Sequence, residues 1–367
     1  MERLDSLDAF RGFAIASMVL VNNPGDWAHL HAPLAHAAWN GWTFTDLVFP
    51  FFLFAAGASM AISVDRRMRA GQGSQGVVSG LARRAAVIFL VGLVLNLLPA
   101  FDFSTVRIPG VLQRIALCIL IAAPLAVHAS TRAIAIWIVL LLAAYTLLML
   151  FVPVPGADGV VAAGRLEPGR DFGAWLDRAL MDGHLWAQSR TWDPEGLTST
   201  LPAACSLLFG VLAGRALVVA RPGLAIPAAF LVAGISGVAL GLALDAVLMP
   251  INKNLWTPAY CVFMTGCSLI AFAAFHAAMD ATAGPLRTAA RKALLPLTIY
   301  GMNALFIFAL SGLVARLLVP FKAGLYAPIQ ALPLSPENAS LAYAVAFEAA
   351  MFAVAWIMWR KRWFVKV

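Results

Sequence analysis

Residues 22–50 read NNPGDWAHLHAPLAHAAWNGWTFTDLVFP and join two long apolar runs, at residues 12–21 and 47–62. A plain connector between two membrane helices needs only a turn and a few polar residues. This one holds three of the six histidines together with three tryptophans, three asparagines and two aspartates. Imidazole, amide and carboxylate groups bind polar ligands and move protons. We therefore interpret this stretch as the active-site hairpin of a membrane enzyme.

The composition excludes a soluble domain. The chain has 367 residues, of which 62% are hydrophobic and only 12% charged, whereas soluble domains are about one-quarter charged. In a membrane protein, excess Lys and Arg gather in the loops on the cytoplasmic side of the bilayer. We therefore attribute the net charge of +8 to these loops and not to a surface that binds nucleic acid. The four cysteines lie in apolar runs without CxxC spacing, which argues against disulfides and zinc. The first apolar run has no cleavage signature and predicts a retained helix.

The fold class predicted is all-α, a polytopic membrane helix bundle of about ten transmembrane helices in a single domain, residues 1–367. The expected spans are residues 9–23, 44–63, 83–99, 111–127, 133–152, 198–218, 225–249, 255–278, 294–318 and 340–359. The long loop at residues 153–197 holds three tryptophans that need something to pack on, so we expect it to cover the outer mouth as a lid. Residues 319–339 form a shorter outer cover. Close glycine pairs such as Gly210 and Gly214 predict helix packing, and these small residues leave a homodimer open.

Positive charges fall in alternate connectors, which predicts that both termini are cytoplasmic and that the hairpin faces the other compartment. The inner charges are Arg3, Arg11, Arg66, Arg67, Arg69, Arg83, Arg84, Arg132, Arg215, Arg221, Arg287, Arg291, Lys292, Arg360, Lys361, Arg362 and Lys366.

Polar groups near membrane depth are expensive unless they are paired or functional. Arg107 and Arg114 bracket the motif RIPGVLQR, and they fit a phosphate or carboxylate clamp as well as two arginines that reach the interface. Asn252, Lys253 and Asn254 form a polar turn that suggests a cavity wall. We expect Asp245 and Glu348 to be internal salt-bridge partners.

Among the histidines, His36 is the leading catalytic candidate, because it directly precedes AAWNGWT, where the chain returns to the membrane. A lone histidine is more often structural, but Asn22, Asn40 and Asp46 lie nearby in sequence, and a neutral imidazole can accept a proton. A metal site formed by the three hairpin histidines is the rival reading, although their spacing matches no recognised ligand pattern, and no metal is predicted. Trp39, with its neighbours in the hairpin, could stack on a sugar ring.

Five motifs resemble the heparan-α-glucosaminide N-acetyltransferase family and its bacterial relatives associated with N-acetylglucosamine utilisation. They are SLDAFRGFAIASMVLVNNPG (6–25), HAAWNGWTFTDLVFPFFLF (36–54), RIPGVLQRIAL (107–117), PINKNLWT (250–257) and LPLTIYGMNALFIF (295–308). The resemblance implies a transmembrane acyltransferase that moves acetyl from cytosolic acetyl-CoA to an amino sugar across the membrane, here a bacterial inner membrane. The family's essential histidine maps to His36 in AHAAWNG, and the asparagine of its VN motif maps to Asn22. The extra luminal domain of the lysosomal enzyme has no counterpart here, so heparan sulfate is not carried over as the substrate.

Within this reading, His36 acts as a base or as a nucleophile, Asn22 donates to the thioester oxygen, and Asp46 orients the imidazole. Direct transfer is favoured, because it needs only one positioned base. Arg107, Arg114 or Lys253 would bind the coenzyme A phosphates, on a side of the membrane that the sequence does not identify. The acceptor is an amino sugar or glycan fragment. Two alternatives stay open, namely a transporter of a sugar or peptidoglycan fragment and a non-catalytic membrane partner.

Overall fold

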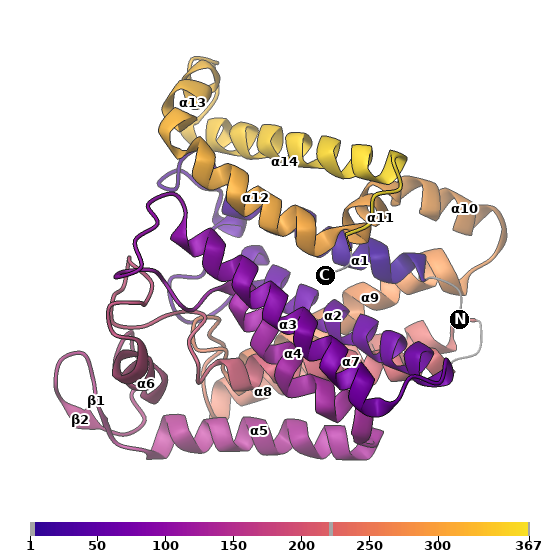
Figure 1. The fold of residues 1–367 in the computed structure, drawn as a ribbon, viewed down its shortest axis with the longest axis horizontal. Coiled ribbons are helices and arrows are strands. Elements are labelled where there is room, and N and C mark those ends of the chain that lie inside the picture. Colours follow the sequence, from indigo (N-terminus) through magenta and orange to yellow (C-terminus); the bar gives the residue numbers. More distant parts are fainter. Residues whose placement is uncertain (1–3, 220–222, 366–367) are drawn as a thin grey trace.

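Apolar helices make up almost all of the computed structural model, which describes residues 4–219 and 223–365 (Figure 1). Arg3, Arg221 and Lys366, which we counted among the inner charges, lie outside these residues. In chain order the helices are α1 (Asp5–Asn22), α2 (Phe44–Arg69), α3 (Ser74–Leu97), α4 (Val111–His128), α5 (Thr131–Phe151), α6 (Phe172–Met181), α7 (Thr200–Val219), α8 (Ala225–Val247), α9 (Pro258–His276), α10 (Gly284–Ala293), α11 (Leu295–Met302), α12 (Ala304–Leu318), α13 (Lys322–Gln330) and α14 (Pro336–Arg360). The predicted all-α class is confirmed.

Nine of the described segments are long and apolar enough to cross a membrane: α2, α3, α4, α5, α7, α8, α9 with the turn that follows it, α12 continued through α13, and α14. The first predicted span, 9–23, corresponds to α1, which is only 18 residues long and carries Asp5, Asp8 and Arg11 in its first half. The protein is thus a multi-pass helix bundle. Few residues of α5, α8 and α12 are buried inside the protein, as expected for helices that face lipid.

The predicted single span at 294–318 is wrong, because the chain breaks at Asn303 into α11 and α12. The Asn303 amide group is used by the C-terminal segment. Its Nδ2 donates to the carbonyl of Trp363 (3.0 Å), and its Oδ1 accepts from the backbone N–H of Val365 (2.9 Å). These bonds of the buried amide to the tail compete with helical hydrogen bonding at the point where the helix breaks.

Close glycine contacts hold the centre of the bundle. A Cβ placed on Gly301 of α11 would lie 1.7 Å from the carbonyl oxygen of Asp8 on α1, and one on Gly210 of α7 would lie 2.0 Å from that of Phe54 on α2. Only a residue without a side chain allows backbones to approach so closely. The packing role predicted for the glycine pairs is therefore confirmed for Gly210 and Gly214, each of which abuts the α2 backbone.

The hairpin between α1 and α2 lies against the segments that follow α5 and α12. The N–H of Gly25 donates to the carbonyl of Ser340 at the start of α14 (3.1 Å), and the indole N–H of Trp39 donates to the carbonyl of Leu166 (2.9 Å). Figure 1 shows α6, the short β1 (Val154–Pro155) and β2 (Val161–Ala162) pair and α13 at the left end of the molecule, opposite α10. The 153–197 loop is therefore partly ordered as a helix and a hairpin, and residues 319–339 contain α13.

The expectation of salt bridges for Asp245 and Glu348 is wrong within the described residues. Asp245 Oδ1 accepts from the backbone N–H of Ile251 (2.6 Å), and Glu348 Oε2 has no hydrogen-bond partner. Asp245 is used to close the turn after α8, a local bond that competes with any ion pair.

Candidate active site

The start of α2 places a carboxylate at the base of the hairpin. Thr43 is the N-cap of α2, and Asp46 at the third helical position completes a capping box. Asp46 Oδ2 accepts from the backbone N–H of Thr43 (2.9 Å) and of Ala37 (3.1 Å). The Tyr260 hydroxyl of α9 donates to the carbonyl of Asp46 (2.6 Å). These bonds use both the side chain and the backbone carbonyl of Asp46. They therefore fix the position of this buried carboxylate at the start of α2.

The second oxygen of the same carboxylate contacts the hairpin histidine. His36 Nδ1 lies 2.6 Å from Asp46 Oδ1, and the His36 side chain is 41% exposed while that of Asp46 is 1% exposed. An ionised carboxylate only accepts hydrogen bonds, so His36 Nδ1 is the donor in this contact, and in a neutral imidazole Nε2 then carries the lone pair. An imidazole oriented in this way presents a basic nitrogen at the surface of the hairpin.

Lys253 lies beside that basic nitrogen. Its Nζ is 3.2 Å from His36 Nε2 and 3.4 Å from Nδ1. Burial lowers the pKa of the Lys253 amine, and the charges of Glu195 and Asp46 only partly offset this effect. In the described chain Lys253 has no carboxylate within salt-bridge distance. The histidine and the lysine therefore form a compact pair of proton-exchanging groups backed by Asp46.

The turn that carries Lys253 is bonded to the hairpin. Asn252 is fully buried and donates through Nδ2 to Asn40 Oδ1 (3.0 Å), and the Gly41 N–H donates to the carbonyl of Ile251 (2.7 Å). Asn252 Oδ1 also accepts from the N–H of Leu255 (2.9 Å). These bonds make Asn40 and Asn252 the groups that hold the turn and the hairpin together, and they position Lys253 against His36.

Tryptophans connect the hairpin to the 153–197 loop. Trp39 packs edge-on against Trp192 with 5.0 Å between ring centres, and Trp192 packs on Trp186 at 5.5 Å. Through its indole N–H, Trp39 also contacts this loop at Leu166. The loop therefore lies directly against the hairpin, and its role as a lid stays a prediction.

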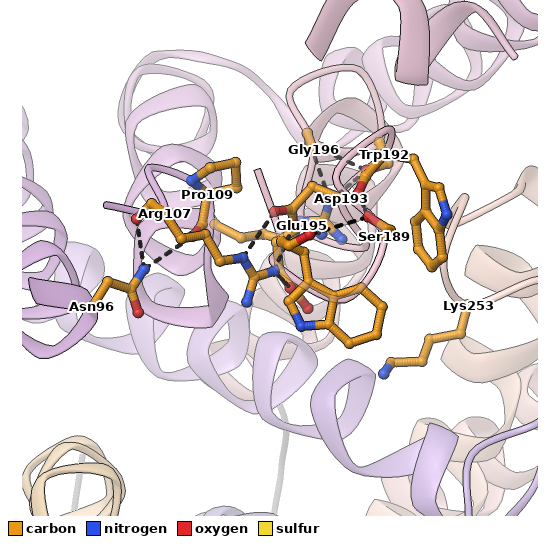
Figure 2. A network of polar contacts seen from close by, with 12 residues as sticks. Asn96, Arg107, Pro109, Ser189, Trp192, Asp193, Glu195, Gly196 and Lys253 are labelled. Atoms are coloured by element: carbon orange, nitrogen blue, oxygen red, sulfur yellow. Dashed lines mark hydrogen bonds and ion pairs between the residues drawn. The ribbon is translucent and has the colours of Figure 1, made fainter. Parts of the chain in front are cut away.

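Arg107 lies in an ion-pair network with the end of that loop. It donates through Nε to Asp193 Oδ2 (2.8 Å) and through Nη2 to Asp193 Oδ1 and Glu195 Oε2, both at 2.5 Å. Figure 2 shows the guanidinium pointing into the two carboxylates, with Asn96 bonded to the backbone of Arg107 and Pro109. Burial disfavours both charges, but the attraction prevails, so the pKa of Arg107 is raised and that of Glu195 is lowered.

Arg114 is buried in the same region. It is 1% exposed, and its Nη2 donates to the carbonyl of Gly196 (3.1 Å) and to the Ser199 hydroxyl. Its guanidinium carbon lies 5.3 Å from the ring centre of Trp256. Arg107 and Arg114 thus both bind residues 193–199, which join the loop to α7, and neither reaches the interface as a free side chain.

The remaining sequence candidates make no hydrogen bond with His36 among the described residues. Asn22 is the last residue of α1, and its side chain is exposed without a hydrogen bond to any described residue. Asn254 is half-buried and lines a hollow under the 153–197 loop. His29 and His31 have separate partners, Asp26 and Asn338. The described residues contain no group of three or more side chains placed to hold a metal ion.

Comparison with known proteins bears on this arrangement. The family model of heparan-alpha-glucosaminide N-acetyltransferase, catalytic, matches residues 3–157, which include the hairpin, Asp46, Arg107 and Arg114. The heparan-alpha-glucosaminide N-acetyltransferase of Homo sapiens is 27% identical over 333 residues, and that of Mus musculus is 29% identical over 325 residues. These alignments cover 76% and 74% of this chain but 49% and 48% of the two relatives.

The predicted family resemblance is confirmed. The chain spans about half the length of the curated heparan-alpha-glucosaminide N-acetyltransferases that it matches. Lys253 and its neighbouring asparagines lie beyond the part of the chain that the family model covers, so their place beside His36 comes from the structure.

Sequence reasoning missed the partners of the predicted residues. Asp193, Glu195 and Trp192 occupy the run TWDPEG just before α7, and its two acidic residues close to a span were a usable signal for a partner of Arg107. No comparable signal indicated that Tyr260 would contact Asp46, because the two residues are more than 200 positions apart.

Proposed function

We propose that this protein is an acetyl-CoA-dependent membrane acyltransferase that acetylates an amino group of a sugar, with His36 as the general base. The observation that carries the proposal is the contact of His36 with both Asp46 and Lys253, on a chain that resembles known N-acetyltransferases. The names of those relatives suggest acetyl transfer to a glucosamine unit, and acetyl-CoA as the donor is part of the proposal.

In the proposed reaction, the neutral amine of the acceptor attacks the carbonyl carbon of the acetyl thioester. His36 Nε2 takes the proton that the nitrogen loses as the C–N bond forms, while the Nδ1–H bond to Asp46 stabilises the imidazolium. The C–S bond then breaks, and the proton passes to the leaving coenzyme A thiolate. Lys253 Nζ, 3.2 Å from Nε2, can relay this one proton from the imidazolium to the sulfur. Direct transfer in this form needs no covalent intermediate.

Asn22 is proposed to donate to the thioester oxygen as negative charge develops on it. Its side chain is exposed and makes no hydrogen bond among the described residues, so its donors are available. Arg107 is paired with two carboxylates, and Arg114 is only 1% exposed although its Nε and Nη1 lack partners among the described residues. Lys253 is therefore the better candidate among the three to contact an anionic part of coenzyme A. We further propose that both termini are cytoplasmic and that the hairpin faces the opposite side.

The experiment measures transfer of radiolabelled acetyl from acetyl-CoA to glucosamine by the purified protein in lipid nanodiscs. His36→Gln should lower kcat/KM by about 10²–10⁴-fold, the usual contribution of a general base. His29→Gln is the matched control, because His29 lies in the same hairpin and also contacts an aspartate, and it should leave the rate unchanged.

Three results would decide against the proposal. Equal activity of His36→Gln and wild type would remove the catalytic role. Label that stays on the wild-type protein without an acceptor would replace direct transfer by an acetyl-histidine route. Absence of transfer together with sugar uptake into vesicles would favour the transporter.

A further inference from the structure

A small hollow under the 153–197 loop contains three buried carboxylates. It has space for a water-sized group, and its lining includes Asp171, Asp177, Trp192, Asp193 and Asn254. Asp171 is 3% exposed, Asp177 3% and Asp193 5%. Carboxylates are rarely buried unless they are paired, so this wall needs an explanation.

One oxygen in this wall has no donor. Asp171 Oδ1 caps α6 by accepting from the N–H of Ala174 (3.0 Å), but Oδ2 has no hydrogen-bond partner. Asp177 Oδ1 accepts from the N–H of Leu197 (2.9 Å). Within the described chain neither Asp171 nor Asp177 forms a salt bridge, whereas Asp193 is paired with Arg107. An unsatisfied buried carboxylate oxygen costs free energy that a bound donor would recover.

The nearby cations do not supply that donor. Arg178 donates to the carbonyls of Gly169, Thr191 and Pro155. Arg114 donates through Nη2 to residues 196 and 199, and its Nε and Nη1 contact neither Asp171 nor Asp177 through a hydrogen bond. Burial raises the pKa of Asp171, and it raises the pKa of Asp177 to about 7. The charges of Arg178 and Arg114 offset these shifts only in part.

The hollow adjoins the proposed active site. Asn254 in its wall follows Lys253, whose Nζ lies 3.2 Å from His36 Nε2. Trp192, also in the wall, packs on Trp39 of the hairpin. A sugar chain whose reacting amine lies at His36 would therefore extend toward this hollow under the 153–197 loop.

We propose that the hollow is a subsite for an ammonium group of the acceptor, bound by Asp171 and Asp177. An ammonium has the size of the space and carries both the donors and the positive charge that the wall lacks. The amine that reacts at His36 has to be neutral, so the ammonium in the hollow is a second one. Acceptors with amines on adjacent sugar units, such as a β-1,4-linked glucosamine dimer, then bind more tightly than glucosamine. This inference rests on the proposed acetyl transfer for the identity of the acceptor.

The test titrates the glucosamine dimer and glucosamine into the purified protein without acetyl-CoA, by calorimetry, and then repeats both as acceptors in the transfer assay. The variants are Asp171→Asn and Asp177→Asn, which keep the oxygen that accepts from Ala174 or Leu197 but remove the charge. Asp182→Asn is the control, because Asp182 follows the same helix and is exposed. Circular dichroism and thermal melting check folding, and if one variant fails to fold the other decides.

Wild type and Asp182→Asn should bind the dimer about tenfold more tightly than the monomer, an advantage that Asp171→Asn and Asp177→Asn lose. In the transfer assay, Asp171→Asn and Asp177→Asn should each raise KM for the dimer relative to wild type and leave KM for acetyl-CoA unchanged. Equal dimer affinity in wild type and Asp171→Asn would overturn the subsite and leave a hollow that holds only water. Asp171-dependent binding without any acetyl transfer would support the subsite and reject the proposed function. If both variants transfer acetyl to the dimer with the wild-type KM, the subsite is rejected and the proposed function is not.

Discussion

The bond between Asp46 and His36 allows a sharp prediction for Asp46→Asn. Asp46 Oδ2 accepts two backbone N–H groups, from Thr43 at 2.9 Å and Ala37 at 3.1 Å, while Oδ1 contacts His36 Nδ1 at 2.6 Å. An asparagine has only one carboxamide oxygen. To keep the two backbone bonds that start α2, that oxygen has to occupy the Oδ2 position, which turns the NH2 group toward His36.

The imidazole then has to accept at Nδ1, and its proton moves to Nε2. A nitrogen that carries a proton cannot take one from the acceptor amine, so the base is lost although the geometry is kept. In serine proteases, the same exchange behind a catalytic histidine costs about 10⁴ in kcat. We expect a loss of about 10²–10⁴-fold here, equivalent to about 3–5 kcal/mol of transition-state stabilisation, because the exposed His36 ring can partly reorient.

The assay is acetyl transfer to glucosamine at saturating acetyl-CoA, with Asp26→Asn as the matched control. Asp26 contacts His29 at 2.7 Å in the same hairpin, but both side chains are exposed, so this variant should retain wild-type activity. Asp46→Asn protein that is folded by circular dichroism and retains more than about one-third of the wild-type rate would refute the assigned tautomer, since the predicted loss is at least 10²-fold.

Three further predictions follow from other contacts. Gly301→Ala should lower the melting temperature in detergent strongly, because the new Cβ would lie 1.7 Å from a carbonyl oxygen of α1, whereas Gly324→Ala in α13 meets nothing within 4 Å and should be neutral or slightly stabilising. Asp177→Asn should stabilise the protein at pH 8 by up to about 4 kcal/mol, with the gain vanishing below pH 4. The pKa of this carboxyl rises on folding from 3.8 to about 7, so the wild-type protein loses stability as the pH rises through that window. Chemical unfolding of both proteins at pH 4 and pH 8 measures the difference in their free energies of unfolding. The same difference at both pH values would contradict this reasoning. Lys253→Met should reduce acetyl transfer about tenfold or more by removing the amine beside Nε2, and unchanged kinetics would limit that lysine to a structural role.

The membrane spans were predictable because each is a local property. About 20 apolar residues suffice to define a span, and eight of the nine described segments correspond to expected spans, the exception being Ala304–Gln330, which covers only part of the span predicted at 294–318. The break at Asn303 was not predictable in this way. It involves Trp363 and the N–H of Val365, about 60 residues further along the chain, and a hydropathy window cannot register a bond over that separation.

In the candidate site, too, contacts between residues near in sequence were predictable and contacts between distant residues were not. The motif TFTD predicts a helix start with a carboxylate in the first turn, and AHAAWNG places an imidazole ten residues earlier, so the pairing of His36 with Asp46 was within reach of sequence reasoning. The partners of the two arginines were not, because Arg107 and Asp193 are 86 residues apart. An arginine in an apolar context fits a ligand clamp and an internal ion pair equally well until its neighbours are known.

By itself, the sequence determined that this chain forms a membrane helix bundle, that its polar hairpin concentrates the reactive groups, and that His36 is the leading base. Only the tertiary structure decided that Lys253 lies 3.2 Å from that base, that Arg107 binds two carboxylates, and that Asp171 keeps an unsatisfied oxygen in a buried wall. The physical reason is the range of the interactions. Helix formation and lipid exposure depend on neighbouring residues, whereas charge pairing and desolvation depend on which distant segments the packing of the helices brings together.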